Sequence, residues 1–179
     1  MKRVALTGLA GSGKSTAARH LVEWHKFQRI SYAAPIKRMM RCLLIEAGAG
    51  FLEAVEMVDG ALKELPTPYL AGHSTRYGLQ TLGTEWGRDI IAPDIWRRIL
   101  LRKVAAAEGP VVVDDLRFPN EAEALRLAGF TLVRITRPGS GTASAHSSEA
   151  GDFEVDVTLE NHGSYEDLFM KLDGIVEGL

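Results

Sequence analysis

A glycine-rich segment at residues 8–16 constrains this chain more than any other stretch. It reads GLAGSGKST and fits the pattern G-x-x-x-x-G-K-[ST]. The apolar run Arg3–Thr7 before it predicts a buried strand, and residues 16–22 after it can continue directly into a helix. In this context the glycines let backbone N–H groups turn inward at the positive end of a helix. The segment therefore predicts a binding site for the phosphates of a nucleoside triphosphate.

Within this segment each residue type has an expected task. Lys14 is expected to reach the β- and γ-phosphates, and the Ser15 hydroxyl is expected to coordinate Mg²⁺. The other phosphate contacts are expected from the backbone and hydroxyl groups of the loop, namely Gly8, Gly11, Ser12, Gly13 and Thr16.

The composition is that of an ordinary soluble domain. The 179 residues fit one domain with a substantial core, and 46% hydrophobic and 25% charged residues are typical values. A net charge of −2 gives little support for binding to nucleic acid or to an anionic membrane. Cys42 is the single cysteine, which excludes an intramolecular disulfide, and its apolar neighbours predict a buried thiol. No stretch approaches the length of a membrane span, so we expect a cytoplasmic protein.

Short apolar runs alternate with helical patterns, which predicts a parallel α/β architecture. After the first strand, further strands are expected at residues 29–32, 111–113, 131–136 and 155–159. Helices are expected at 36–44, 51–65 and 77–82, and others are expected to begin near Asp94, Asn120 and Ser164. Residues 138–148 are rich in Gly, Ser, Ala and Thr, and form either a flexible surface loop or a lid that excludes water from bound nucleotide.

Two carboxylates follow the β-branched run at 111–113. Side chains alternate along a strand, so only one of Asp114 and Asp115 can face the phosphates. We favour Asp115 as the residue that orients the Mg²⁺ shell, because it begins a loop that also contains Arg117. The alternative is that the aspartate caps a turn or a helix.

Arg76 and Arg88 flank a glycine-containing stretch at 77–87, where backbone and guanidinium groups can both approach a ligand. Each arginine either binds phosphate or forms the surface ion pair that is the common fate of exposed arginines. Judged by residue type alone, Trp96 fits core packing and Lys37 fits a solvated helix face.

Three stretches together resemble the deoxynucleoside monophosphate kinases of tailed bacteriophages. They are SYAAPIK at 31–37, LQTLGTEWGR at 79–88 with PDIW at 93–96, and DLRFPNE at 115–121. A weaker similarity lies in HSSE at 146–149 and NHGS at 161–164. The glycine-rich segment is shared by all P-loop proteins, whereas the 79–96 and 115–121 stretches are much more specific. The match extends from about residue 3 to about residue 172.

This resemblance implies an α/β P-loop fold of the nucleoside monophosphate kinase type, with a five-stranded parallel sheet flanked by helices. It also implies in-line transfer of the γ-phosphoryl group of ATP to a deoxynucleoside monophosphate. We therefore expect a single kinase domain over residues 1–179. Within it we expect a monophosphate-binding helical region at about 33–96 and a lid-like loop at about 137–150.

Carried over residue by residue, the resemblance assigns expected roles. Lys14, Asp115, Arg88 and Arg117 become the expected catalytic residues, and Ser15 and Asp115 the magnesium ligands. Arg137 joins the ATP site, because residues 138–150 lack the arginines that such kinases commonly carry in the lid. The expected acceptor-binding residues are Ala34, Lys37, Arg76, Gln80, Arg88 and Trp96.

Two alternative functions remain open from the sequence. A related P-loop kinase of a ribonucleotide or of dephospho-coenzyme A shares this layout, although the block at 82–88 argues against it. A nucleotide-dependent switch that acts through a protein or DNA partner is disfavoured by the small size and the near-neutral charge. We expect a deoxynucleoside monophosphate as partner, no direct contact with nucleic acid or membrane, and a monomer or homodimer. If the chain is phage-encoded, the cytoplasm is that of the bacterial host.

Overall fold

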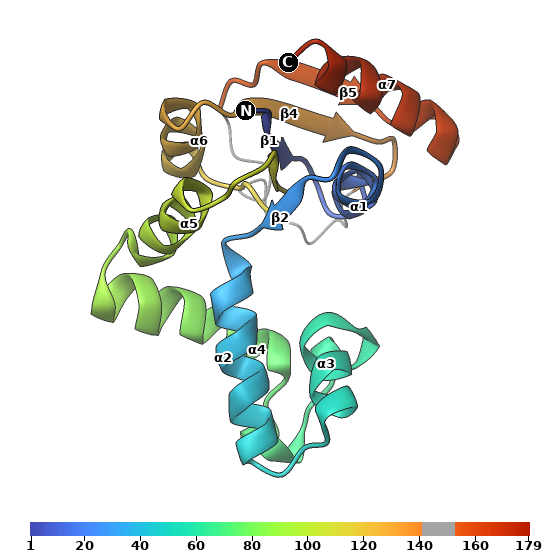
Figure 1. The fold of residues 1–179 in the computed structure, drawn as a ribbon. Coiled ribbons are helices and arrows are strands. Elements are labelled where there is room, and N and C mark those ends of the chain that lie inside the picture. The colour runs from blue at the N-terminus through green and yellow to red at the C-terminus, as the bar shows by residue number, and fades with distance from the viewer. Residues whose placement is uncertain (141–152) are drawn as a thin grey trace. The chain divides into compact units, whose positions relative to one another are not determined.

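Five parallel strands form one sheet in the order β2-β3-β1-β4-β5 in the computed structural model, which describes residues 1–140 and 153–179 (Figure 1). The strands are β1 (Arg3–Thr7), β2 (Gln28–Ile30), β3 (Val111–Val113), β4 (Thr131–Thr136) and β5 (Val157–Glu160). The predicted five-stranded parallel sheet is thus confirmed. In the central strand, Ala5 pairs with Val113 of β3 and with Leu132 of β4.

Helices connect the strands and account for most of the remaining chain. They are α1 (Lys14–His25), α2 (Ala33–Glu46), α3 (Phe51–Asp59), α4 (Thr75–Thr81), α5 (Ile95–Ala105), α6 (Pro119–Leu127) and α7 (Tyr165–Glu177). Two short 3₁₀ helices are η1 (Ala61–Glu64) and η2 (Pro68–Leu70), and η3 (Leu82–Ile91) is a π-helix. Within the described ranges, no helix is both long and apolar enough to span a bilayer.

The chain folds into two compact units. The first comprises residues 1–31 and 100–179 and contains the sheet, and the second comprises residues 32–99. The helical region expected at 33–96 lies inside the second unit. Residues 141–150 of the expected lid-like loop lie outside the described residues, together with the HSSE stretch.

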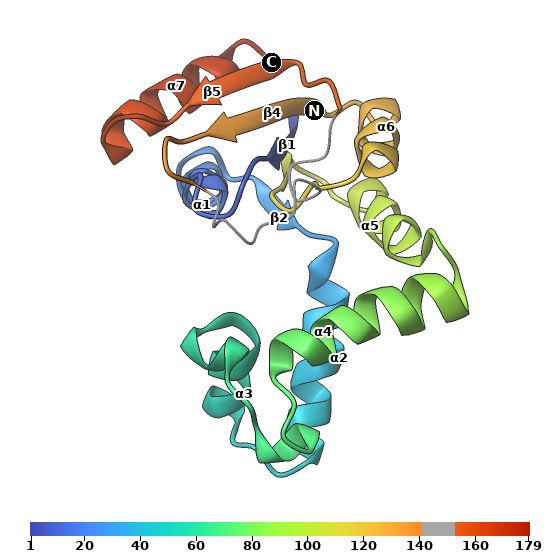
Figure 2. The same ribbon diagram turned by 180° about the vertical axis from the view of Figure 1, so that it is seen from behind.

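The core of the first unit lies between the sheet and two helices. Val4, Leu6 and Val112 of the sheet are buried against Leu21 of α1 and Leu172 of α7. Figures 1 and 2 show α6 on the other side of the sheet from α1 and α7. Because both faces are covered, the central strand β1 and its neighbour β3 contain continuous buried apolar runs rather than alternating patterns.

The core of the second unit is formed mainly by helices, which Figure 2 shows, with Ala49 from the loop between α2 and α3. Met40 and Leu44 of α2 pack with Ala54 and Val58 of α3. Cys42 is exposed, so the expectation of a buried thiol is wrong. Positions four apart share one helix face, and Cys42 lies midway between Met40 and Leu44 on the opposite side.

The helix expected over residues 51–65 is interrupted. α3 ends at Asp59, Gly60 adopts an extended backbone, and η1 follows. A Cβ atom at Gly60 would lie 2.0 Å from Oε2 of Glu56, so glycine lets the chain turn where a larger residue would displace that carboxylate.

Candidate active site

The loop between β1 and α1 depends on glycines with positive φ. These angles are 143° at Gly8, 79° at Gly11 and 109° at Gly13. A Cβ atom at Gly8 would lie 2.2 Å from the carbonyl oxygen of Ile135 in β4, so a larger residue does not fit. Gly13 is the N-cap of α1, has no side chain with which to cap the first turn, and is followed by no acidic residue in that turn. The helix therefore presents N–H groups and a positive dipole end suited to an anion.

Lys14 folds back onto this loop. Its Nζ atom donates hydrogen bonds to the carbonyl oxygens of Gly8 and Leu9, each at 2.7 Å. The side chain of Ser12 is fully buried, and its Oγ has no hydrogen-bond partner among residues 1–140 and 153–179. Ser15 is exposed at the start of α1, and Thr16 is half-buried. A bound phosphate would compete with the two carbonyl oxygens for the Lys14 ammonium group.

Asn161, which directly follows β5, anchors this loop although the two are far apart in sequence. Its Nδ2 donates a buried hydrogen bond to the carbonyl oxygen of Ser12 at 2.8 Å, across 149 positions in the chain. Its backbone N–H bonds to the carbonyl oxygen of Thr136 at 2.8 Å, which extends the β4–β5 pairing by one residue. A Cβ atom at Gly13 would lie 2.6 Å from Nδ2. In the sequence the NHGS stretch is only a weak similarity, and no local pattern indicates a role for Asn161.

The two carboxylates after β3 have different surroundings. Asp114 is 5% exposed and forms an ion pair with Arg29 of β2. Its Oδ1 atom is buried without a hydrogen-bond partner in the part of the chain that the structure describes. Asp115 is half-buried. Since β3 pairs directly with β1, both carboxylates and the glycine-rich loop leave the sheet at the same carboxyl edge, where parallel α/β proteins bind ligands.

The loop after Asp115 is held by a buried glutamate. Oε2 of Glu121 accepts hydrogen bonds from the backbone N–H groups of Arg117 at 3.1 Å and Phe118 at 3.2 Å. Helix α6 therefore begins at Pro119 with Phe118 as N-cap, one residue before the start predicted from Asn120. Arg117 is exposed on this loop.

Arg137 directly follows β4 and is also exposed. The sheet thus brings the sequence-predicted residues of the first unit to one edge: the loop at 8–16, the aspartates, Arg117 and Arg137.

In the second unit, Trp96 fixes the π-helix that carries Arg88. The indole Nε1 donates to the carbonyl oxygen of Gly83 at 2.7 Å, and a Cβ atom at Gly87 would lie 2.3 Å from the Trp96 ring. Trp96 is 3% exposed, while Arg88 is half-buried. A π-helix is rare and often accompanies a functional site. Sequence periodicity did not predict it, although the glycines at 83 and 87 are the signal that marks a close approach.

The other candidate residues of the second unit have varied environments. Lys37 and Arg41 both pair with Asp59, at 2.8 and 2.7 Å. Partial burial by itself would raise the pKa of Asp59, but the hydrogen bond from Lys37 and the positive charges of Lys37, Arg41 and Lys63 hold that pKa below its usual value. Arg76 forms an exposed ion pair with Glu64 at 2.9 Å. Gln80 is exposed and Ala34 is half-buried.

Comparison with known proteins identifies similar sequences. The model of the family described as deoxynucleotide monophosphate kinase matches residues 67–172. A protein of Acanthamoeba polyphaga mimivirus that bears the same family name is 31% identical over an alignment of 196 residues. The alignment covers 99% of this chain and 97% of the viral protein. The deoxynucleotide monophosphate kinase of Enterobacteria phage T4 is 30% identical over 59% of this chain and 46% of its own length. The deoxynucleoside-5'-monophosphate kinase of Escherichia phage T5 is 46% identical over 30% of this chain and 22% of its own length.

Solved structures show the same fold at low identity. Shikimate kinase from Aquifex aeolicus superposes with a TM-score of 0.55 at 14% identity, over 98% of this chain and 96% of its own. TT1252 from Thermus thermophilus gives a TM-score of 0.54 at 20% identity, over 99% of this chain and 97% of its own. Both likenesses establish the architecture alone.

Proposed function

The chain belongs to the deoxynucleotide monophosphate kinase family, and from this membership we propose that it transfers the γ-phosphoryl group of ATP to a deoxynucleoside monophosphate. The observation that carries the proposal is the loop at residues 8–16. Its positive-φ glycines, its uncapped helix end and its lysine make a phosphate cradle in a chain that matches the family over residues 67–172.

Binding of the ATP phosphates is assigned to the glycine-rich loop. Backbone N–H groups between Gly8 and Thr16 would contact phosphate oxygens, and Lys14 would leave the carbonyls of Gly8 and Leu9 to reach the β- and γ-phosphates. The hydrogen bond that Asn161 Nδ2 donates to the Ser12 carbonyl oxygen is proposed to keep that carbonyl turned away from this cradle. Arg137, at the same edge of the sheet, is proposed to add positive charge.

The residues at this edge fit a magnesium ion. A serine hydroxyl and carboxylate oxygens are the hard ligands that Mg²⁺ prefers, and the buried Oδ1 of Asp114 has no hydrogen-bond partner among the described residues. We propose Ser15 and Asp115 as the ligands, because Asp115 begins the loop at this edge of the sheet that also carries Arg117. When bound, the ion would neutralise charge on the β- and γ-phosphates.

Recognition of the acceptor is assigned to the second unit. Arg88 is the leading candidate for the acceptor phosphate, since Trp96 anchors the π-helix that carries it. Ala34, Lys37, Arg76 and Gln80 are proposed to complete this site. The ion pairs of Lys37 with Asp59 and of Arg76 with Glu64 would have to open, or else accept the ligand alongside.

The reaction needs positioning and charge stabilisation more than covalent help. An oxygen of the acceptor phosphate attacks the γ-phosphorus in line with the leaving ADP oxygen, and that attacking oxygen is already ionised near neutral pH. A general base is therefore not required. Lys14, Arg88 and Arg117 are proposed to stabilise the charge that spreads over the transferred group.

A substrate panel tests this function. ADP formation would be measured with ATP and Mg²⁺ against each deoxynucleoside and ribonucleoside monophosphate, with dephospho-coenzyme A as a further acceptor. Turnover with one or more deoxynucleotides is expected, and it would also define base and sugar selectivity. Turnover confined to ribonucleotides or to dephospho-coenzyme A would overturn the proposal, as would ATP binding without turnover of any acceptor.

Matched variants test the residue roles. Lys14→Met is expected to abolish turnover, whereas Lys171→Met, on an exposed lysine paired with Asp167, is expected to behave as wild type. Arg88→Ala is expected to lower kcat by about 10³-fold or more while ATP still binds. Its control, Arg98→Ala, removes an exposed guanidinium that pairs with Asp94. Normal monophosphate kinetics in Arg88→Ala would exclude its role.

We further propose that the protein acts in the cytoplasm, that of the bacterial host if it is phage-encoded, as a monomer or homodimer without a nucleic-acid partner. The net charge of −2 supports the last point, since a nucleic-acid surface needs clustered positive charge. Light scattering of the purified protein, with and without DNA, measures its oligomeric state and its binding to nucleic acid.

A further inference from the structure

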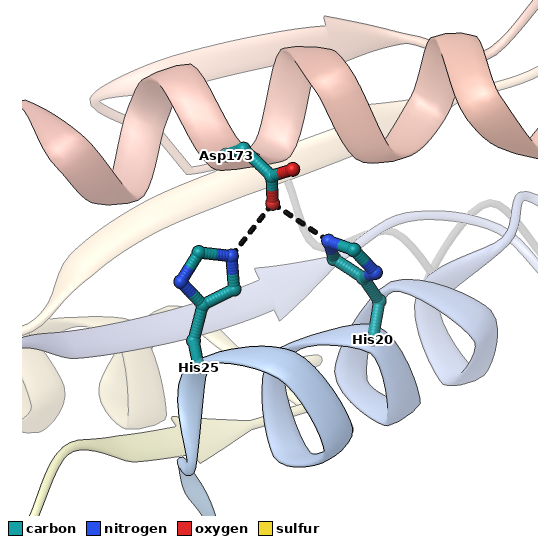
Figure 3. Close-up of side chains that lie close together, drawn as sticks. All are labelled: His20, His25 and Asp173. Atoms are coloured by element: carbon teal, nitrogen blue, oxygen red, sulfur yellow. Dashed lines mark hydrogen bonds and ion pairs between the residues drawn. The ribbon is translucent and has the colours of Figure 1, made fainter.

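Two histidines in the second half of α1 converge on one carboxylate of α7 (Figure 3). Nε2 of His20 lies 2.6 Å and Nε2 of His25 lies 2.7 Å from the same atom, Oδ1 of Asp173. The three atoms all lie within 4.8 Å of one another. The proposed phosphoryl transfer uses none of these residues.

We propose that His20, His25 and Asp173 bind a divalent transition-metal ion of the Zn²⁺ type. Two imidazole nitrogens and one carboxylate oxygen form a donor set that zinc takes in proteins, with water completing a tetrahedral shell. These donors also discriminate against Mg²⁺, which prefers oxygen ligands alone. The site is therefore distinct in chemistry from the one proposed at Ser15 and Asp115.

The geometry needs a small adjustment to admit the ion. Zn²⁺ lies about 2.0–2.2 Å from nitrogen and oxygen ligands, so donor atoms in a tetrahedral shell are roughly 3.3 Å apart. Each imidazole nitrogen would thus move away from Oδ1 by roughly 0.6 Å, and the two nitrogens, which lie within 4.8 Å of each other, would settle at the same spacing. His20 is held by stacking on Phe169, with ring centroids 4.1 Å apart and planes inclined by 5°. The side chains of His25 and Asp173 are 25% and 36% exposed, so they can rotate and leave an entry path from solvent.

The charges also favour a cation. Burial by itself would raise the pKa of Asp173, but the hydrogen bonds from both histidines lower it, so the carboxylate is ionised near neutral pH. Metal binding requires each histidine to present its Nε2 lone pair, which leaves the ring hydrogen on Nδ1. The ion would replace the two N–H···O bonds by coordinate bonds and would cross-link α1 to α7.

Calorimetric titration of the full chain, without an affinity tag or nucleotide, with ZnCl₂ tests the proposal. One ion per chain is expected. His25→Ala and Asp173→Asn should each weaken binding at least about tenfold, because loss of even an outer-shell partner costs that much at typical metal sites. The control is His162→Ala, which removes an exposed histidine whose Nε2 lies 3.3 Å from Oε2 of Glu160.

A second measurement protects the test from variants that fail to fold. Co²⁺ added to the wild-type protein should produce the intense visible absorption of a four-coordinate ion, and excess Zn²⁺ should abolish it. Absence of binding in the wild-type protein would overturn the proposal. So would Zn²⁺ affinity that is unchanged in folded His25→Ala and Asp173→Asn, or a loss of affinity in His162→Ala as large as theirs.

Discussion

Replacement of Asn161 by alanine should weaken ATP binding although Asn161 itself is not expected to touch the nucleotide. The substitution removes the hydrogen bond from Nδ2 to the Ser12 carbonyl at 2.8 Å and leaves that buried oxygen without its donor. Such a loss costs about 1–3 kcal/mol. The loop can reduce this cost by turning the Ser12 carbonyl toward the side where the phosphates bind. The same free energy is then lost from phosphate binding.

The expected effect on kinetics follows from this energy. A free energy of 1–3 kcal/mol corresponds to about a 5- to 150-fold rise in the KM for ATP, with a much smaller change in the KM for the monophosphate. Asn161→Asp should be worse than Asn161→Ala, because a carboxylate would face the Ser12 carbonyl oxygen as a second acceptor and would add negative charge near the phosphates. Asn120→Ala is the matched control, since Asn120 is exposed on α6.

The assay is steady-state ADP formation with each substrate varied in turn, together with thermal unfolding of each variant. The decisive quantity is the ratio of the two KM changes. A variant that unfolds at lower temperature but keeps its KM for ATP would refute the reasoning, because it would make Asn161 a purely structural residue. Equal rises in both KM values would refute it as well.

Three further predictions concern stability. Gly87→Ala should lower the free energy of unfolding by about 1–3 kcal/mol in a thermal or urea experiment, because its Cβ would lie 2.3 Å from the Trp96 ring. The control Gly109→Ala should be nearly neutral, because its Cβ would have nothing within 4 Å. Similar costs for the two variants would contradict the packing argument. Glu121→Ala should cost about 1 kcal/mol by removing the acceptor of two backbone N–H groups at the start of α6, and an unchanged unfolding free energy would argue against this cap. The pKa of Asp173 is below its ordinary value of 3.8. Its contribution to the free energy of unfolding is therefore fully present above pH 3.8 and is lost as the pH falls through the lower, folded-state pKa. In urea unfolding at successively lower pH, the free energy of unfolding should therefore fall more steeply in wild type than in Asp173→Asn. Parallel curves would contradict a stabilising role of the ionised Asp173 carboxylate.

Local patterns predicted the sheet and the phosphate loop well. The loop at 8–16 depends on neighbours in sequence, and β3 is a run of three valines that only a buried strand accommodates easily. The helix patterns failed where a specific contact decided the outcome. Gly60 ends α3 early beside Glu56, and the backbone at 82–91 widens into a π-helix against Trp96.

The candidate site was predictable only in part, because its parts meet through tertiary structure. Asn161 reaches Ser12 across 149 residues, and no local pattern encodes that pairing. His20 and His25 are five positions apart, about 140° around a helix axis, rather than at the usual metal-binding spacing. Their convergence on Asp173 follows from the end of α1 at His25 and from the packing of α7.

The contact between Asn161 and Ser12 also orders events during synthesis of the chain. The phosphate loop is synthesised 149 residues before Asn161, which holds the Ser12 carbonyl, and β1 lies between two strands that are made more than a hundred residues later. A nascent chain stopped before residue 161 therefore carries the complete GLAGSGKST motif without the support that shapes it. Nucleotide binding should therefore begin only after residue 161 has been made, and bound ATP then stabilises chains that contain this contact over shorter ones.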